Sequence, residues 1–223
     1  SKERPAPHPA KRVPKEGRAF LTRLFGKVVC AMIIQPSKIT SVFTLGNEMP
    51  HEAAQREALL DRAMGAARKR KSSEKLRRGR LPAEGLAFVA RDEDGRVIGT
   101  VRLWNVAANC VRRGQADALL LGPLAVDPFH NGKGIGKALM THAIAEAARL
   151  EHAAIILVGD AAYYERFGFS ADKTGDLFMP GPFEKSRLLA LELQDGAVDG
   201  MNGVIFATGR KVQATGVRVR KAA

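Results

Sequence analysis

The chain alternates between segments with two different spacings of apolar residues, which predicts both strands and helices. Short apolar runs bounded by turn residues predict strands at 39–45, 86–90, 97–106, 118–126, 155–158, 188–193 and 204–207. Apolar residues at helical spacing predict helices at 51–64, 72–78, 134–150 and 161–167, with Ser72 or Ser73 as the cap of the second. The elements therefore follow the order β-α-α-β-β-β-α-β-α-β-β.

The connections between these elements predict how the strands pair. Asp94 and Gly95 separate the strands at 86–90 and 97–106, and this dipeptide is typical of a tight antiparallel hairpin. A helix joins the strands at 118–126 and 155–158, as it does in connections between parallel strands. We therefore expect an α/β (α+β) fold with an antiparallel first half and one parallel crossover.

Most of the positive charge lies at the two ends of the chain. Of the formal net charge of +13, residues 1–31 carry +6 and residues 208–223 carry +5, which leaves about +2 for the residues between. Residues 1–35 are rich in proline and charge and have no sustained period, so we interpret them as a basic, flexible extension. A folded domain at 36–207 and a basic tail at 208–223 would follow. Because basic ends are usually solvated, we do not expect nucleic acid as a partner.

One basic segment lies inside the expected domain. The stretch from Arg62 to Arg80 contains nine Lys or Arg residues and a single acid, Glu74. We favour a solvated helix face for this segment. The alternative is a basic wall beside an anionic cofactor or an acidic acceptor.

Composition excludes several further classes. The chain has no apolar run near the ~18 residues that a membrane helix needs, so we expect no membrane partner. Its two cysteines, Cys30 and Cys110, are far apart in apolar surroundings, which favours a reducing, cytoplasmic location over a disulfide framework. The five histidines and two cysteines show no metal-ligand spacing, and we expect no metal site.

The clearest chemical signal is the segment VDPFHNGKGIGKALM, which begins at Val126. Gly132, Gly134 and Gly136 leave its backbone amides without side-chain cover, and a helix follows at once. Uncovered amides and the positive end of a helix dipole together bind phosphate groups. We therefore predict that a phosphate-bearing ligand binds here.

Two common phosphate loops do not fit this segment. A P-loop requires glycine at 131 and Ser or Thr at 138, where the chain has Asn131 and Ala138. The dinucleotide fingerprint needs its third glycine one residue later, and residues 127–131 separate the strand from the first glycine. Asp160 does end the next strand at a distance suited to a ribose contact, but the third option, an acyl-CoA loop, fits better.

The segment LGPLAVDPFHNGKGIGKAL closely resembles the signature of the GNAT superfamily of acyl-CoA-dependent N-acyltransferases. That signature is a strand ending in a V-x-P turn, followed by [RQ]-x-x-G-x-[GA] at the start of a helix. Gly134 and Gly136 match it, and Asn131 stands where Arg or Gln is usual. The segment LVGDAAYYERFGF resembles the second family signature. With PGP at 180–182 and the LLALEL strand, residues 36–207 look most like the YhbS-like bacterial branch.

The resemblance implies a fold and a cofactor. The fold would be a mixed, mostly antiparallel sheet with a V-shaped split between two central parallel strands and helices on both faces. The acyl donor would be acetyl-CoA, with no metal. Its pantetheine arm would pair with the backbone of Leu124, Ala125 and Val126. Its pyrophosphate would lie against the amides of a loop that consists of Asn131, Gly132, Lys133, Gly134, Ile135, Gly136 and Lys137.

The resemblance also implies direct transfer of an acetyl group to a neutral amine in a ternary complex. Tyr164 lies four residues before Gly168, where the family has the tyrosine that protonates the CoA thiolate. No residue stands out as the base; Glu84, Asp117 and Asp127 are candidates, and an ordered water is the alternative. The acceptor would be a small molecule or a protein amine, and paired late strands would suit a homodimer.

Several of these residues also have simpler interpretations. One of the adjacent tyrosines, 163 and 164, would face the core and the other the cleft. Asp160 would cap the next helix, His130 would be idle in its loop, and Trp104 would belong to the core rather than to an acceptor pocket. For the whole chain, a non-catalytic acyl-CoA sensor and a nucleic-acid-associated protein with basic ends remain alternatives.

Overall fold

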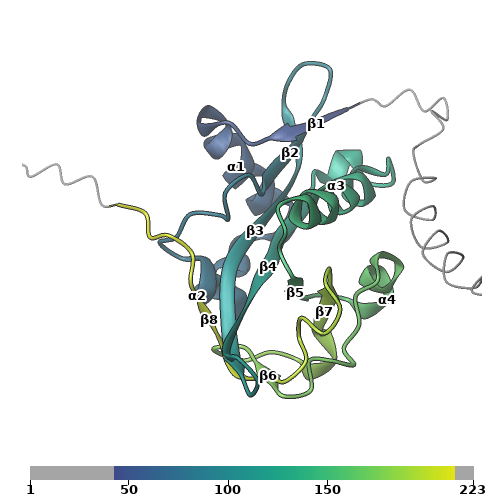
Figure 1. The fold of residues 1–223 in the computed structure, drawn as a ribbon. Helices are drawn as coiled ribbons and strands as arrows, with labels where there is room; N and C mark the ends of the chain where they lie inside the picture. The colour runs from purple at the N-terminus through teal and green to yellow at the C-terminus, as the bar shows by residue number, and fades with distance from the viewer. Residues whose placement is uncertain (1–42, 214–223) are drawn as a thin grey trace, which may run out of the picture. The chain divides into compact units, whose positions relative to one another are not determined.

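The computed structural model describes residues 43–213, so the predicted extension at 1–35 and the end of the predicted tail lie outside the described residues (Figure 1). The strands are β1 Thr44–Asn47, β2 Ala87–Arg91, β3 Val97–Cys110, β4 Gly114–Val126, β5 Ala154–Val158, β6 Leu177–Phe178, β7 Leu188–Glu192 and β8 Met201–Ala207. The helices are α1 Ala53–Met64, α2 Ser72–Arg77, α3 Ile135–Arg149 and α4 Ala161–Tyr164. Short 3₁₀ turns lie at Pro50–Glu52, Ala66–Arg70, Pro128–His130, Glu165–Phe167 and Lys185–Arg187.

Most of the predicted elements are present. The strand predicted at 39–45 lies largely outside the described residues, and β1 begins at Thr44 and ends at Asn47. Three other differences are informative. Strands β3 and β4 continue past the predicted ends at 106 and 118 into a long hairpin, because alanines and polar residues pair there without a strong apolar signal. The two-residue strand β6 was too short to predict. The predicted serine cap of α2 is wrong: Lys71 occupies the cap position, and the Ser73 hydroxyl instead accepts a hydrogen bond from Arg77.

The sheet has the strand order β1-β2-β3-β4-β5-β7, with β8 paired to the distal half of β3. Most neighbours are antiparallel, as predicted. Strands β4 and β5 are parallel, which confirms the predicted crossover, but they pair only at Leu119–Ile155 and Leu120–Ile156. A second parallel pair, β6 with β8, was not predicted.

Two apolar clusters cover the two faces of this sheet. On one face, Leu119 of β4 packs with the buried side of α3; on the other, Leu120 packs with Trp104 and with Leu76 of α2. Helix α3 lies directly on β3, since a Cβ at Gly99 would come within 2.8 Å of the Ile135 side chain. The expected arrangement, with helices on both faces of a split sheet, is confirmed (Figure 1).

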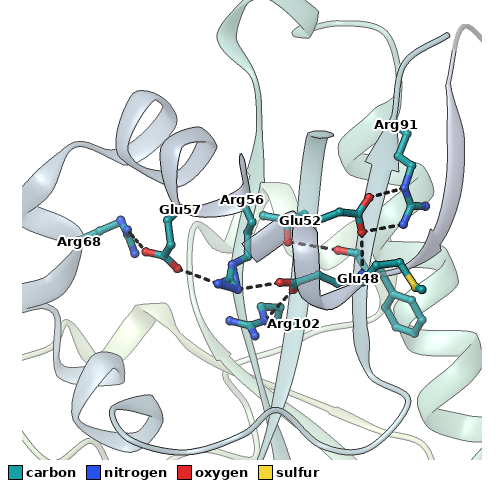
Figure 2. A network of polar contacts seen from close by, with 10 residues as sticks. Glu48, Glu52, Arg56, Glu57, Arg68, Arg91 and Arg102 are labelled. Atoms are coloured by element: carbon teal, nitrogen blue, oxygen red, sulfur yellow. Dashed lines mark hydrogen bonds and ion pairs between the residues drawn. The ribbon is translucent and has the colours of Figure 1, made fainter. Parts of the chain in front are cut away.

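A buried ion pair holds the start of α1 to the sheet (Figure 2). The Glu52 carboxylate accepts hydrogen bonds from Arg91 Nε (2.6 Å), Arg91 Nη2 (2.8 Å) and the Met49 amide (2.6 Å). The hydrogen bond from Arg91 lowers the pKa of Glu52 by more than burial raises it. This pair therefore fixes the turn before α1 to strand β2.

A second set of pairs runs from β3 to the turn that follows α1 (Figure 2). Glu48 lies between Arg56 (2.9 Å) and Arg102 (3.2 Å), and Glu57 lies between Arg56 and Arg68. Burial, with the nearby charge of Arg56, lowers the pKa of Arg102 to about 10. The network thus positions the 66–70 turn and its buried Arg68 against the sheet.

The first residues after β8 pair with the segment that follows α2. The Leu81 amide donates to the Arg210 carbonyl, and the Val212 amide donates to the Gly79 carbonyl. Within residues 43–213, every helix is too short or too polar to cross a membrane.

Replacing Glu52 by Gln is expected to lower the free energy of unfolding by about 2 kcal/mol at neutral pH, because Arg91 loses its buried partner. The folded pKa of Glu52 is lowered, so the ion pair stabilises above the ordinary carboxyl range, and its contribution is lost as pH falls through the lowered pKa. Glu52→Gln should therefore lose less stability than the parent chain on acidification. Urea unfolding at about pH 7 and pH 4 measures both effects.

The matched control is Asp94→Asn, which breaks an ion pair with Arg96 whose two side chains are 70% and 75% exposed. This variant should change the unfolding free energy little at either pH. An effect of Asp94→Asn as large as that of Glu52→Gln would contradict the role assigned to burial.

Candidate active site

The central feature of the site is the split between β4 and β5. Past Leu120 and Ile156 the two strands separate, and within the described chain no strand pairs with the open edge of β4 there. A cavity of about 90 Å³ lies in the split. The strands line it with Leu121, Gly122, Pro123, Leu124, Leu157 and Val158, and the helical layers with Met64, Arg68, Lys71, Ser73, Arg77 and Tyr164.

A bulge shapes β4 at the edge of this cavity. Gly122 and Pro123 together face one residue of β3, because the register shifts between Val101 and Leu103. The indole N–H of Trp104 donates a 2.6 Å hydrogen bond to the Gly122 carbonyl. The Arg102 guanidinium lies over the Trp104 ring, 5.0 Å from its centroid. Trp104 is thus a core residue, as its simpler interpretation predicted, and its hydrogen bond to Gly122 stabilises the bulge.

The glycines of the loop are required for two different reasons. Gly132 (φ 79°) and Gly134 (φ 78°) are in the left-handed region, and Gly134 is the cap residue of α3. Gly136 has ordinary backbone angles, but the Tyr163 hydroxyl lies 3.0 Å from the position that a Cβ would take there. Side chains at the first two positions would strain the loop, and one at the third would displace a tyrosine.

The loop presents uncovered hydrogen-bond donors. The first helical bond of α3 runs from the Ala138 amide to the Gly134 carbonyl, at 3.0 Å. Among the described residues, no acceptor is bonded to the backbone amides from Gly132 to Lys137. Lys133 and Lys137 are exposed, whereas the Ile135 side chain is buried and contributes only its amide. This arrangement suits a phosphate at the positive end of a 15-residue helix.

The strand end before the loop is anchored to α1. The Asp127 carboxylate accepts hydrogen bonds from the Phe129 amide (3.1 Å) and from Arg62 Nη2 (2.7 Å). Burial raises the pKa of Asp127, but these two donors outweigh it, and the net pKa is lowered. Asp127 therefore fixes the turn that leads into the loop. Of the candidate bases, Glu84 and Asp117 are exposed, and none of the three lines the cavity.

Tyr164 lines the cavity at the end of α4. Its ring packs edge-on against Phe169 (6.0 Å between centroids) and lies so close to Gly159 that a Cβ there would come within 2.2 Å of Cε2. Burial, with smaller contributions from Tyr163 and Asp160, raises the pKa of Tyr164 to about 12. The phenol is therefore protonated throughout the physiological range.

The neighbouring residues are also placed. Tyr163 does not simply face the core, since its hydroxyl reaches the glycine loop at Gly136. Asp160 occupies the cap position of α4, but its side chain makes no capping hydrogen bond; its carbonyl accepts the amides of Tyr163 and Tyr164. His130 is partly buried, and its Nδ1 has no hydrogen-bond partner among the described residues.

The basic segment at 62–80 is a wall of the cavity rather than only a solvated face. Arg68 is 8% exposed and the Arg77 side chain 9%, so the favoured interpretation is wrong for these two residues. Arg68 is neutralised by Glu57 and Asp61. The alternative, a basic wall, describes the segment better.

Other hollows differ in position and lining. One of about 180 Å³ adjoins the cavity, because Lys71, Ser73 and Val158 line both. A larger one, of about 420 Å³, is lined by polar residues that include Asp117 and His152 and shares no residue with the loop or the cavity. Its size alone does not make it the active site. Within residues 43–213, no three potential metal-binding side chains come together.

The chain is similar to known proteins in sequence and in fold. Residues 83–171 match the family described as an acetyltransferase (GNAT) domain. The uncharacterized N-acetyltransferase YhbS of Escherichia coli K12 is 31% identical over 158 residues, which are 71% of this chain and 92% of that protein. The crystal structure of E. coli YhbS in complex with CoA is 29% identical with a TM-score of 0.63, and the match covers 78% of this chain and 93% of that one. A Brucella melitensis GNAT family acetyltransferase in complex with acetyl-CoA is 24% identical with a TM-score of 0.49, over 68% of this chain and 96% of that one.

The family match extends over the elements that build the split and the loop. Residues 83–171 contain β2 to β5, α3 and α4, whereas the basic wall at 62–80 lies before them. The fold, the likeness to YhbS and its coverage agree with the resemblance seen in the two sequence signatures. The chain belongs to the GNAT superfamily of N-acetyltransferases.

Proposed function

We propose that the chain transfers an acetyl group from acetyl-CoA to an amine by direct attack in a ternary complex. The observation that carries this proposal is the open edge of β4 leading directly into a loop of uncovered amides at the start of α3. The relative YhbS, crystallised with CoA, supports the choice of acyl donor.

The donor would bind along the strand and the loop. The backbone of Leu124, Ala125 and Val126 would pair with the pantetheine arm as a neighbouring strand does. The amides from Gly132 to Lys137 would hold the pyrophosphate, and exposed Lys133 and Lys137 would add positive charge. The Asn131 amide, which was also predicted to contribute, already donates to the Pro128 carbonyl at 3.4 Å. A backbone amide at the end of β4 would stabilise the oxygen of the thioester as it becomes negative.

The chemical step forms a carbon–nitrogen bond and breaks the carbon–sulfur bond of the thioester. The amine loses one proton, and the departing sulfur gains one. With a pKa of about 12, the Tyr164 phenol is a weaker acid than a thiol, whose pKa is ~8.5. Tyr164 therefore stabilises the sulfur mainly as a hydrogen-bond donor while the bond breaks, and any proton it gives up returns from the former amine through water.

The cavity favours a neutral amine without a dedicated base. Its lining includes no carboxylate, but it includes Lys71 and Arg77. Arg68 also lines it, but its charge is neutralised by Glu57 and Asp61. Nearby positive charges lower the pKa of an ammonium group because they disfavour its charged form. The basic wall would thus raise the fraction of acceptor that has a free lone pair, and water would accept the proton.

Tyr164→Phe is expected to lower kcat by about a hundredfold, because the departing sulfur loses its donor. The Kd of acetyl-CoA should change little. Thiol release with a panel of amines measures kcat, and calorimetric titration measures Kd. The matched variant is Tyr163→Phe, which removes the hydroxyl beside Gly136 of the loop. It should raise the Kd of acetyl-CoA and leave kcat little changed. Full turnover by Tyr164→Phe would remove Tyr164 from the mechanism, and acetyl-CoA binding without any wild-type turnover would favour the sensor alternative.

Gly134→Ala is expected to weaken acetyl-CoA binding by about tenfold, since a side chain at φ 78° costs about 1–2 kcal/mol and shifts the loop amides. Calorimetry with acetyl-CoA measures the effect, with NAD as a ligand that should not bind. Gly95→Ala is the control, because Gly95 has a similar φ of 76° in a hairpin turn. Both variants should be destabilised, but only the first should bind acetyl-CoA more weakly. Equal Kd values for the two would contradict the placement of the pyrophosphate.

A further inference from the structure

The basic wall of the cavity contains a buried cation that is only partly satisfied. The Arg77 side chain is 9% exposed, and its Nη2 lies 3.2 Å from the Glu74 carboxylate and 3.3 Å from the Ser73 hydroxyl. Its Nε is buried without a hydrogen-bond partner in the part of the chain that is described. Nη1 lies 3.7 Å from the position that a Cβ would take on Gly122, at the bulge. Arg77 therefore has guanidinium N–H groups without an acceptor among the described residues, and they lie beside the bulge at Gly122.

The cations of this wall differ in how far they are neutralised. Within residues 43–213, Lys71 forms no ion pair, whereas Arg77 pairs with Glu74 and Arg68 has two acidic partners. In the adjoining hollow, the Arg187–Glu184 pair is loose, at 3.9 Å, and both side chains are largely exposed. Burial is the largest influence on Arg77 and lowers its pKa. An acceptor whose only charge is an ammonium would be repelled by Lys71 and would offer no hydrogen-bond acceptor to Arg77.

The phosphates of the acyl donor do not account for this wall. They have the loop amides, Lys133 and Lys137, at the start of α3. Helix α2, which carries Arg77, packs through Leu76 into the apolar cluster on the opposite face of the sheet from α3. The wall also lies outside residues 83–171, the range that the family shares. The phosphates bound at the loop would thus leave Arg77 and Lys71 without a ligand.

We infer that the acceptor is a small primary amine that also carries a carboxylate or a phosphate, and that Arg77 and Lys71 bind this anionic group. The inference rests on the proposed function, since it names the class of amine that the transferase uses. Ser73, which lines both hollows, would add a hydroxyl donor. Arg77 and Lys71 are then the residues that determine specificity.

Matched pairs of amines test the inference. O-phosphoethanolamine is compared with ethanolamine, and 4-aminobutyrate with butylamine, by thiol release at saturating acetyl-CoA and by calorimetric titration. At least one anionic amine should exceed its neutral counterpart in kcat/KM by about tenfold or more, as expected for hydrogen bonds to a charged group. The pair with the larger ratio distinguishes phosphate from carboxylate. Neutral amines that react as well as both anionic ones would overturn the inference.

Variants locate the effect. Arg77→Met and Lys71→Met should lose most of the preference for the anionic amine and keep the Kd of acetyl-CoA within about twofold. The controls Arg70→Met and Lys69→Met remove exposed charges from the same segment but not from the cavity, and should keep the preference. Thermal melting checks that each variant folds. Lys71 is exposed, so Lys71→Met should fold and keep the test possible even if Arg77→Met does not fold. A preference that survives Lys71→Met and any folded Arg77→Met, or a loss confined to acetyl-CoA binding, would overturn the inference.

Failure of the proposed function would look different. The wild-type chain would then bind no acetyl-CoA and release no thiol with any amine. Calorimetric titration of the same four amines onto the chain alone would still measure the anion preference and its dependence on Lys71 and Arg77. Binding of anionic amines without acetyl-CoA binding would uphold the anion site and reject the transferase. Equal binding of all four would reject the anion site.

Discussion

The separation of β4 from β5 is the feature on which the rest of the site depends. The two strands pair at only two positions, Leu119–Ile155 and Leu120–Ile156, and then separate. A backbone edge inside a folded domain normally finds hydrogen-bond partners, because an unpaired buried donor or acceptor costs free energy. An extended ligand that supplies those partners removes this cost. In the proposed function, the split is therefore the place where an extended ligand binds.

Elements far apart in the sequence keep the split in one conformation. Trp104 holds the carbonyl at the bulge, and Arg102 over its ring belongs to the ion-pair network that reaches α1 (Figure 2). Asp127, paired with Arg62 of the same helix, fixes the strand end that leads into the loop. Helix α1 therefore contacts the strand end before the glycine loop through Arg62 and the turn that carries Arg68 through Glu57.

The sequence predicted those features that depend on residues close together in the chain. The glycine loop and the second signature, which contains Tyr164, each lie within one short segment, and each helix or strand was predicted from the apolar spacing within it. The fold and the family that these signals implied are confirmed. Contacts between distant segments left no such signal. Such contacts depend on the packed sheet. They join Tyr163 to Gly136, Arg62 to Asp127, and Arg77 to Gly122, which are 27, 65 and 45 positions apart in the sequence. The nine basic residues of 62–80 could not be divided by sequence into neutralised, exposed and partly satisfied charges.

An NMR titration of the backbone amides with acetyl-CoA tests most directly whether the split holds the acyl donor. The largest shifts are expected at two adjoining stretches, the loop amides at 132–137 and the open edge of β4 at 121–126. Smaller shifts should appear at Tyr163 and Tyr164. Shifts concentrated around Asp117 and His152, at the larger polar hollow, or no shifts at a saturating concentration, would contradict the claim that the split holds the acyl donor.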